Sequence, residues 1–195
     1  MTVIEFNFND DWMGEIGRRL GDLNDKTPDV ISQATNSTAR KARKLIVQSL
    51  REHYAEDAKT KEYNAAMKIA RASRKKYDAT IYIRGKVQNL RRFNVSPKDP
   101  PASGSSRPPT TRAKVLLQGG LKELNKGGIK AFITTFKNGD VVVAQRNGSF
   151  YTYHRPTGGI DRHHEAIDKL WSISIPKMAE SQLDPKTCLL YTSPS

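Results

Sequence analysis

Residues 36–54 read NSTARKARKLIVQSLREHY, and this stretch decides how the rest of the chain is interpreted. It lies in a run that contains neither glycine nor proline between Pro28 and Tyr54. Thr27 is a good N-cap, Pro28 suits a first helical turn, and the Asp29 carboxylate is favourable beside the positive end of a helix. The pattern predicts one helix of roughly 40 Å, at ~1.5 Å per residue.

We expect one side of this helix to pack on a sheet, because small and apolar residues recur along it at helical spacing. The predicted inward stripe consists of Ile31, Ala34, Thr38, Ala42, Leu45, Ser49 and His53, widened by Val30, Ile46 and Leu50. Small residues in the stripe would let another element approach closely.

The chain is strongly basic, and its charge is concentrated in the middle. It has 33 Lys and Arg against 20 Asp and Glu, a net charge of +13. Residues 36–100 hold 17 cations and 6 carboxylates, and 17 − 6 gives +11 for this segment alone. Such a segment suits a polyanionic partner, either nucleic acid or an acidic protein surface, but it also suits the solvated surface of a basic protein. The candidate residues facing DNA or a neighbouring subunit are Arg40, Lys41, Arg43, Lys44, Arg74, Lys75 and Lys76.

The segments after the helix alternate in ways typical of strands and turns. Residues 60–69 predict a short helix, DATIYIRG and NLRRFNV predict strands, and residues 97–112 form a proline-rich loop or linker. Three further strands are expected, KAFITTF, VVVAQR and SFYTYHR, joined by hairpin turns at Asn138-Gly139 and Asn147-Gly148. A loop is expected up to His164, then a short helical turn from Glu165, and a last helix opening at Pro176.

The predicted fold class is therefore α+β. A long N-terminal helix packs on an antiparallel sheet of about five strands, and a truncated C-terminal helix follows. Residues 1–26 are expected to form an N-terminal helical segment and residues 27–187 a single α+β domain, with a mobile loop at 97–112. The last eight residues, CLLYTSPS, look like translated sequencing-adapter read-through, so we expect Cys188–Ser195 to be a non-native tail.

The sequence offers one weak candidate for metal or catalytic chemistry. His163 and His164 stand beside Glu165 and Asp168, but adjacent residues diverge on both a strand and a helix, so this pair converges poorly. No HExxH, GxSxG or phosphate-loop motif accompanies it. We expect a non-enzymatic protein without metal or cofactor. No apolar run approaches the ~20 residues of a membrane span, and the N-terminus lacks a secretory pattern, which predicts synthesis and assembly in the cytoplasm.

The order of these segments resembles the minor tail protein Z family of tailed phages and prophages, which are tail-completion or neck proteins. The resemblance runs over residues 30–181, through NSTARKARKLIVQSLREHY, AAMKIARAS, ATIYIRGKVQNLRRFNVSPK, KAFITTFKNGDVVVAQR and AIDKLWSISIPKMAES. The sequence departs from the family before Ser174-Ile175-Pro176, where a Gly-Pro step is usual, and in the segment HRPTGGIDRHHEA.

The resemblance implies a structural virion protein at the head-proximal end of the tail. Such a protein would complete the tail and join it to the head. Its implied partners are copies of itself in a ring, the tail terminator and the head-connector proteins, with phage DNA as a further non-specific contact and no membrane. A sequence-independent DNA-binding protein is the alternative that the basic middle segment favours.

Overall fold

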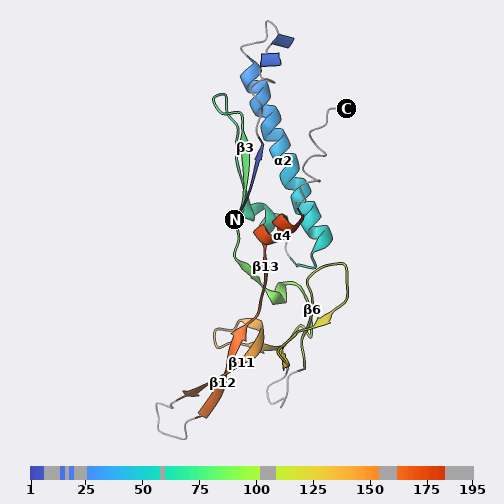
Figure 1. Ribbon diagram of the computed structural model, residues 1–195, viewed down its shortest axis with the longest axis vertical. Coiled ribbons are helices and arrows are strands. Elements are labelled where there is room, and N and C mark those ends of the chain that lie inside the picture. The colour runs from blue at the N-terminus through green and yellow to red at the C-terminus, as the bar shows by residue number, and fades with distance from the viewer. Residues whose placement is uncertain are drawn as a thin grey trace. The chain divides into compact units, whose positions relative to one another are not determined.

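The computed structural model describes residues 1–6, 14–15, 18–19, 26–57, 60–101, 109–153 and 162–182, and these form two compact units (Figure 1). Unit 1 comprises Met1–Glu52, Ala58–Lys86 and Ile173–Ser195, and unit 2 comprises His53–Asp57 and Val87–Ser172. Both units contain segments of the predicted domain 27–187. Most of the predicted N-terminal helical segment, the Pro-rich residues 102–108 and the tail 188–195 lie outside the described residues.

In the part of unit 1 that the structure describes, three named helices accompany one three-stranded sheet. The helices are α2 (Thr27–His53), α3 (Thr60–Ala66) and α4 (Ile175–Gln182). The strands are β1 (Thr2–Phe6), β2 (Met67–Ala70) and β3 (Ala79–Ile83), all antiparallel, with β3 in the centre. The predicted helix over residues 60–69 is wrong after Ala66, because Met67 to Ala70 pair with β3 instead.

The core of unit 1 lies between α2 and this sheet. Ala39 of α2 packs with Ala72 and Ala79, and Phe6 and Ile69 close the cluster. Small side chains at these contacts let the helix approach the strands closely. Ile81 and Ile83 of the central strand are fully buried as well.

The buried face of α2 is not the predicted one. Ile31 and Leu50 are buried and Ile46 is half-buried, as expected, but Val30, Ala34, Thr38, Leu45 and His53 are exposed. The residues that point inward are Ile31, Ser32, Thr35, Ala39, Val47 and Leu50. Apolar residues occur on more than one side of α2, so spacing alone predicted a stripe rotated by about one residue, ~100°, from the real one.

The described part of unit 2 is built almost entirely from strands. They are β4 (Val87–Asn89), β5 (Asn94–Ser96), β6 (Arg112–Lys114), β7 (Lys122–Glu123), β8 (Asn125–Lys126), β9 (Ile129–Lys130), β10 (Phe132–Thr135), β11 (Val141–Tyr153), β12 (Arg162–Lys169) and β13 (Trp171–Ser174). Of these, β11 and β12 are long and the others short, and the last strand, β13, ends with Ile173 and Ser174 of unit 1. The segment NLRRFNV is not one strand, because a 3₁₀ turn at Leu90–Arg92 separates β4 from β5.

The strands of unit 2 form several small ladders. The orders are β10-β11-β12, β5-β6-β7, β8-β9 and β13-β4. The α+β class is therefore confirmed, but a single sheet of about five strands is not found among the described residues, where no sheet exceeds three strands. Short strands broken by turns cannot extend one ladder, which explains the difference.

The two Asn-Gly dipeptides have different structures. Asn138-Gly139 makes the predicted hairpin between β10 and β11, with Gly139 at φ +85°. Asn147-Gly148 makes no hairpin, because β11 continues through it to Tyr153. Gly148 has φ +79°, and the pairing with β12 shifts register between Arg146 and Phe150. This is a β-bulge, which bends a strand and increases its twist.

Residues 162–169 are also not the predicted loop and helical turn. They form β12, which pairs antiparallel with β11 on both sides of the bulge. Beyond Ala144 the strand β11 has left its partner β10, so its outer half and β12 form a two-stranded ribbon (Figure 1). We call residues 145–153 and 162–169 the ribbon.

Candidate interface site

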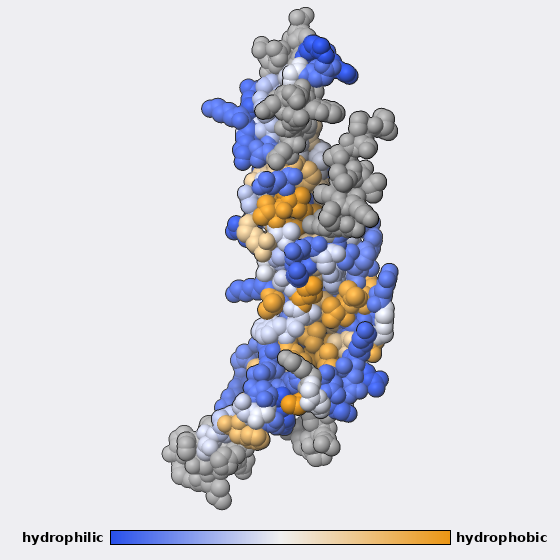
Figure 2. Space-filling model, viewed as in Figure 1, coloured by the Kyte–Doolittle hydropathy of each residue, from blue (hydrophilic) through white to orange (hydrophobic). Residues whose placement is uncertain are grey.

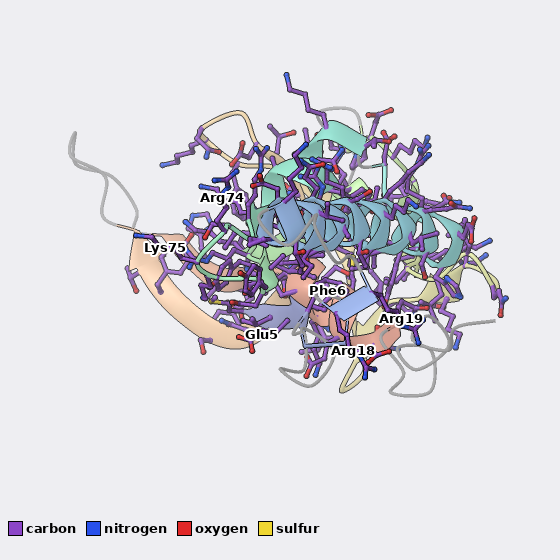
Figure 3. The ribbon with its side chains drawn as sticks, turned by 90° about the horizontal axis from the view of Figure 1, so that it is seen from above. Glu5, Phe6, Arg18, Arg19, Arg74 and Lys75 are labelled. Carbon is purple, nitrogen blue, oxygen red and sulfur yellow. The ribbon has the colours of Figure 1, made fainter. Side chains whose placement is uncertain are left out.

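The seven predicted cations all lie in unit 1 and come from two elements. Arg40, Lys41, Arg43 and Lys44 belong to α2, and Arg74, Lys75 and Lys76 belong to the connection between β2 and β3. This connection turns tightly at Ser73–Lys76: the Ser73 N–H donates to the Lys76 carbonyl at 2.6 Å, and the Lys76 N–H donates back to Ser73 at 3.2 Å. Arg74 and Lys75 are therefore presented at the tip of a turn (Figure 3).

The turn is fastened to the first half of α2. The Asn36 amide Nδ2 donates to the Ala72 carbonyl at 3.0 Å, and the Ala72 N–H donates to Asn36 Oδ1 at 2.9 Å. Asp29, near the start of α2, also receives hydrogen bonds from the Arg74 guanidinium. The four helix cations follow Asn36 by one to two helical turns, so both cationic groups lie along the same helix, within ~6–12 Å of rise from this anchor.

Two of the seven cations are neutralised by carboxylates. Arg74 forms an ion pair with Asp29, and this contact lowers the pKa of Asp29 and raises the pKa of Arg74. The Nζ of Lys76 lies 3.0 Å from Asp78 Oδ2, and this contact raises the pKa of Lys76. Neither cation is well placed to neutralise a phosphate.

The other five cations have no carboxylate within ion-pair distance in the part of the chain that the structure describes. They are Arg40, Lys41, Arg43, Lys44 and Lys75. Arg43 is half-buried and the other four are exposed. We call these five residues the basic flank, and it is the part of the predicted site that remains available to a polyanion.

A second cationic region lies in unit 2, around a cavity of about 400 Å³. Its lining residues are Asp57, Asn89, Arg91, Arg92, Val95, Lys98 and Val141. The Arg92 Nε lies 3.3 Å from Oε1 of the buried Glu56, and Arg91 Nη2 lies 3.5 Å from Asp99 Oδ1. Because both arginines already face carboxylates, this cavity suits an anion less well than the basic flank does.

Three side chains of the weak metal candidate, those of His164, Glu165 and Asp168, make other contacts in the described structure. His164 stacks on Tyr151, with ring centroids 5.7 Å apart, and Arg146 Nη1 lies 3.1 Å from Glu165 Oε2. Asn147 Nδ2 donates to Asp168 Oδ1 at 3.1 Å. Among the described residues, no group of three His, Cys, Asp or Glu side chains is arranged to hold an ion.

Sequence reasoning missed the exposed aromatic residues of the ribbon. Phe150 is 70% exposed and Tyr151 is 54% exposed. Consecutive residues of a strand point to opposite faces, so adjacent aromatic residues place one ring on each face. The run FYTY was the sequence signal for these exposed rings. In a strand with one buried and one solvent-exposed face, apolar residues alternate with polar residues, whereas here two aromatic residues are adjacent.

The chain is therefore an α+β protein with a basic flank, formed by α2 and the β2–β3 connection, and with exposed aromatic residues on the ribbon. None of the helices that the structure describes is both long and apolar enough to cross a membrane. Comparison of the chain with family models, with curated proteins and with solved structures finds no match.

Proposed function

We propose that this chain is a non-catalytic structural protein of a tailed phage or prophage, acting in tail completion at the head–tail junction. The observation that carries the proposal is the outer side of α2. This side presents the exposed cations Arg40, Lys41 and Lys44 of the basic flank together with the exposed residues Val30, Ala34, Thr38 and Leu45. The helix α2 thus offers cations suited to a polyanion and apolar residues suited to a neighbouring protein.

The resemblance to the minor tail protein Z family supports the particular location. The family's ordered segments cover α2, β3, the β10–β11 hairpin and α4 of this chain. In a closed ring each subunit uses the same pair of complementary surfaces. A long helix packed on a sheet within such a ring would set a basic flank near DNA that passes through the neck. The proposed partners are further copies of the chain, a tail terminator and head-connector proteins.

The test is the position of the protein in virions. Immunogold labelling or cryo-electron microscopy should place it at the head-proximal end of the tail, and infected host cells should hold it in the cytoplasm during assembly. Density found solely at the distal tip or baseplate would refute the proposal.

The second candidate is a sequence-independent DNA-binding protein, and it is favoured by the basic flank, whose five cations have no carboxylate partner among the described residues. Each phosphate contact releases condensed counterions, so affinity should fall by orders of magnitude between ~50 and ~200 mM salt. A protein of this kind should bind unrelated duplexes equally well. Binding that does not change with salt would exclude it.

A further inference from the structure

Both Asn-Gly dipeptides of unit 2, Asn138-Gly139 and Asn147-Gly148, lie at exposed positions. In such a step the backbone nitrogen of glycine can attack the side-chain carbon Cγ of the preceding asparagine. The new N–Cγ bond closes a five-membered succinimide ring, the glycine nitrogen loses its proton, and the side-chain Nδ2 gains one and leaves as ammonia. Water then opens the ring and yields aspartate or isoaspartate. Glycine favours the reaction because it has no Cβ to obstruct the approach of its nitrogen.

The side chains of the two asparagines make the same kinds of contact. Asn138 Oδ1 accepts from the Asp140 N–H at 3.1 Å, and its Nδ2 donates to Asp140 Oδ2 at 3.0 Å. Asn147 Oδ1 accepts from the Ser149 N–H at 3.0 Å. Its Nδ2 donates to Asp168 Oδ1 at 3.1 Å. An N–H that donates to Oδ1 draws electron density from Cγ and favours attack there, so these contacts activate both sites alike.

The backbone around the two glycines differs. The Gly139 N–H donates to the Phe136 carbonyl at 2.9 Å, inside the turn between β10 and β11. That hydrogen bond must break before the Gly139 nitrogen can attack. Gly148 lies in the bulge, where the register with β12 that runs through Arg146 resumes only at Phe150. Residues of a bulge lie outside the regular ladder, so less of the fold has to open around Gly148.

The bulge also lies in a part of the fold that is open to water and thinly supported. Residues 146–152 are exposed, and Figure 2 shows hydrophilic as well as hydrophobic surface over this hairpin. The strand β10 pairs with β11 only from Val141 to Ala144, so around the bulge β11 pairs with β12 alone among the described strands. A two-stranded hairpin is at best marginally stable in water. The water and the backbone freedom that the reaction needs are therefore present at Asn147.

We propose that Asn147 is the residue at which this protein deamidates, and that the change loosens the ribbon. Deamidation replaces the Nδ2 donor by a carboxylate oxygen, which then faces Asp168 where the hydrogen bond of 3.1 Å stood. Two carboxylates at this separation repel each other, most strongly at low ionic strength because both positions are exposed. The isoaspartate product also adds a methylene group to the backbone of β11. This inference goes beyond the proposed function and does not rest on it.

The test follows both asparagines in the full chain. The purified protein is incubated at mildly alkaline pH, where the glycine nitrogen loses its proton more easily, and peptide mapping by mass spectrometry measures the conversion of each amide to an acid. Asn147 should convert at least fivefold faster than Asn138. In denaturant the two should convert at similar rates, because the folded backbone no longer distinguishes them. Equal rates in the folded protein, an unmodified Asn147, or a difference that persists in denaturant would overturn the inference.

A second measurement addresses the ribbon itself. Asn147→Asp, which carries the carboxylate of the product, should speed hydrogen exchange at the amides of Phe150 and Tyr151 at least threefold. Asn138→Asp places an acid beside Asp140 in the other turn, and as the matched control it should leave these amides unchanged. Asn147→Gln keeps an amide but would have to close a larger ring, so it should stay unmodified. Exchange that Asn147→Asp leaves unchanged, or that both aspartate variants raise equally, would also overturn the inference.

Discussion

Asn36 of α2 forms two hydrogen bonds with the backbone of Ala72, donating through Nδ2 at 3.0 Å and accepting through Oδ1 at 2.9 Å. The side-chain amide thereby pairs with the peptide groups of the β2–β3 connection as a neighbouring strand would. Together with the Asp29–Arg74 contact, this residue of the stretch 36–54 holds the cationic turn against α2.

Asn36→Ala should lower the free energy of unfolding of unit 1 by about 1–3 kcal/mol, because the part-buried N–H and carbonyl of Ala72 would lose their partners. Urea unfolding followed by circular dichroism measures this. Gln33→Ala, an exposed substitution on the same helix, is the control and should change stability by less than about 0.5 kcal/mol. Equal effects of the two substitutions would show that the Asn36 amide does not anchor the turn.

The Asp29–Arg74 ion pair should make stability depend on pH in the acid range. The hydrogen bonds from Arg74 lower the pKa of Asp29 in the folded state. A lowered pKa stabilises the fold above the unfolded-state value of about 3.9, and this contribution disappears as the pH falls through the folded-state value. The melting temperature of Asp29→Asn should therefore lie below that of the wild type at pH 6, and the difference should shrink below about pH 4.

Arg74→Gln supplies the control for this pH dependence. This variant removes the cationic partner of the same ion pair. The melting temperature of the Asp29→Asn/Arg74→Gln double variant should therefore depend on pH no more than that of Asp29→Asn alone. A melting-temperature difference that stays constant from pH 6 to pH 2 would contradict the assignment.

Arg92 and Glu56 should be energetically coupled in unit 2. The Glu56 side chain is fully buried and the Arg92 side chain is 36% exposed, with 3.3 Å between Oε1 and Nε. Arg92→Met should destabilise the protein by about 2 kcal/mol, because it leaves a buried carboxylate with less compensation. The double variant Glu56→Gln/Arg92→Met should be less damaging than the sum of the single variants.

The neighbouring Arg91→Met is the matched control for Arg92→Met. Arg91 pairs with Asp99, whose side chain is 84% exposed, and exposed pairs contribute about 0–1 kcal/mol. If Arg91→Met and Arg92→Met cost the same in a chemical denaturation experiment, burial of Glu56 is not the source of the coupling.

Gly148→Ala should strain the bulge at the base of the ribbon. Gly148 has φ +79°, a conformation that costs about 1 kcal/mol or more for a residue with a Cβ. The variant should lose about 1 kcal/mol of stability. Gly120→Ala is the control, since Gly120 lacks a positive φ and no atom lies within 4 Å of the added Cβ. Hydrogen exchange of the β11 amides would locate the effect, and unchanged exchange around Phe150 would contradict it.

Charge-reversal variants distinguish DNA binding by the cations of α2 from DNA binding that depends only on the net charge of the protein. Replacing Arg40, Lys41, Arg43 and Lys44 by Glu should reduce the slope of log affinity against log salt by about 4, if each cation contacts one phosphate. The control replaces the exposed lysines Lys61, Lys68, Lys86 and Lys122 by Glu, which changes the net charge equally. Equal losses of DNA affinity in the two variants would mean that only total charge matters.

Features that depend on neighbouring residues were predictable from the sequence alone. The run from Pro28 to Tyr54 lacks helix breakers, Asn138-Gly139 has the residues of a two-residue turn, and the cations of residues 40–44 and 74–76 were all read from local spacing. Local conformational preference is enough for such features, because every interaction involved lies within a few residues.

The buried side of α2 and the conformation of the second Asn-Gly could not be predicted from the sequence, because both depend on contacts between distant segments. Ala39 packs with Ala72 and Ala79 in the core, and Asn36, on the same helix, binds Ala72, 36 residues later in the chain. Asn147-Gly148 becomes a bulge because β12 pairs with β11 on both sides of it. Contacts between distant segments select among faces and turns that are locally almost equivalent, and the energy of those contacts exceeds the small differences in local preference.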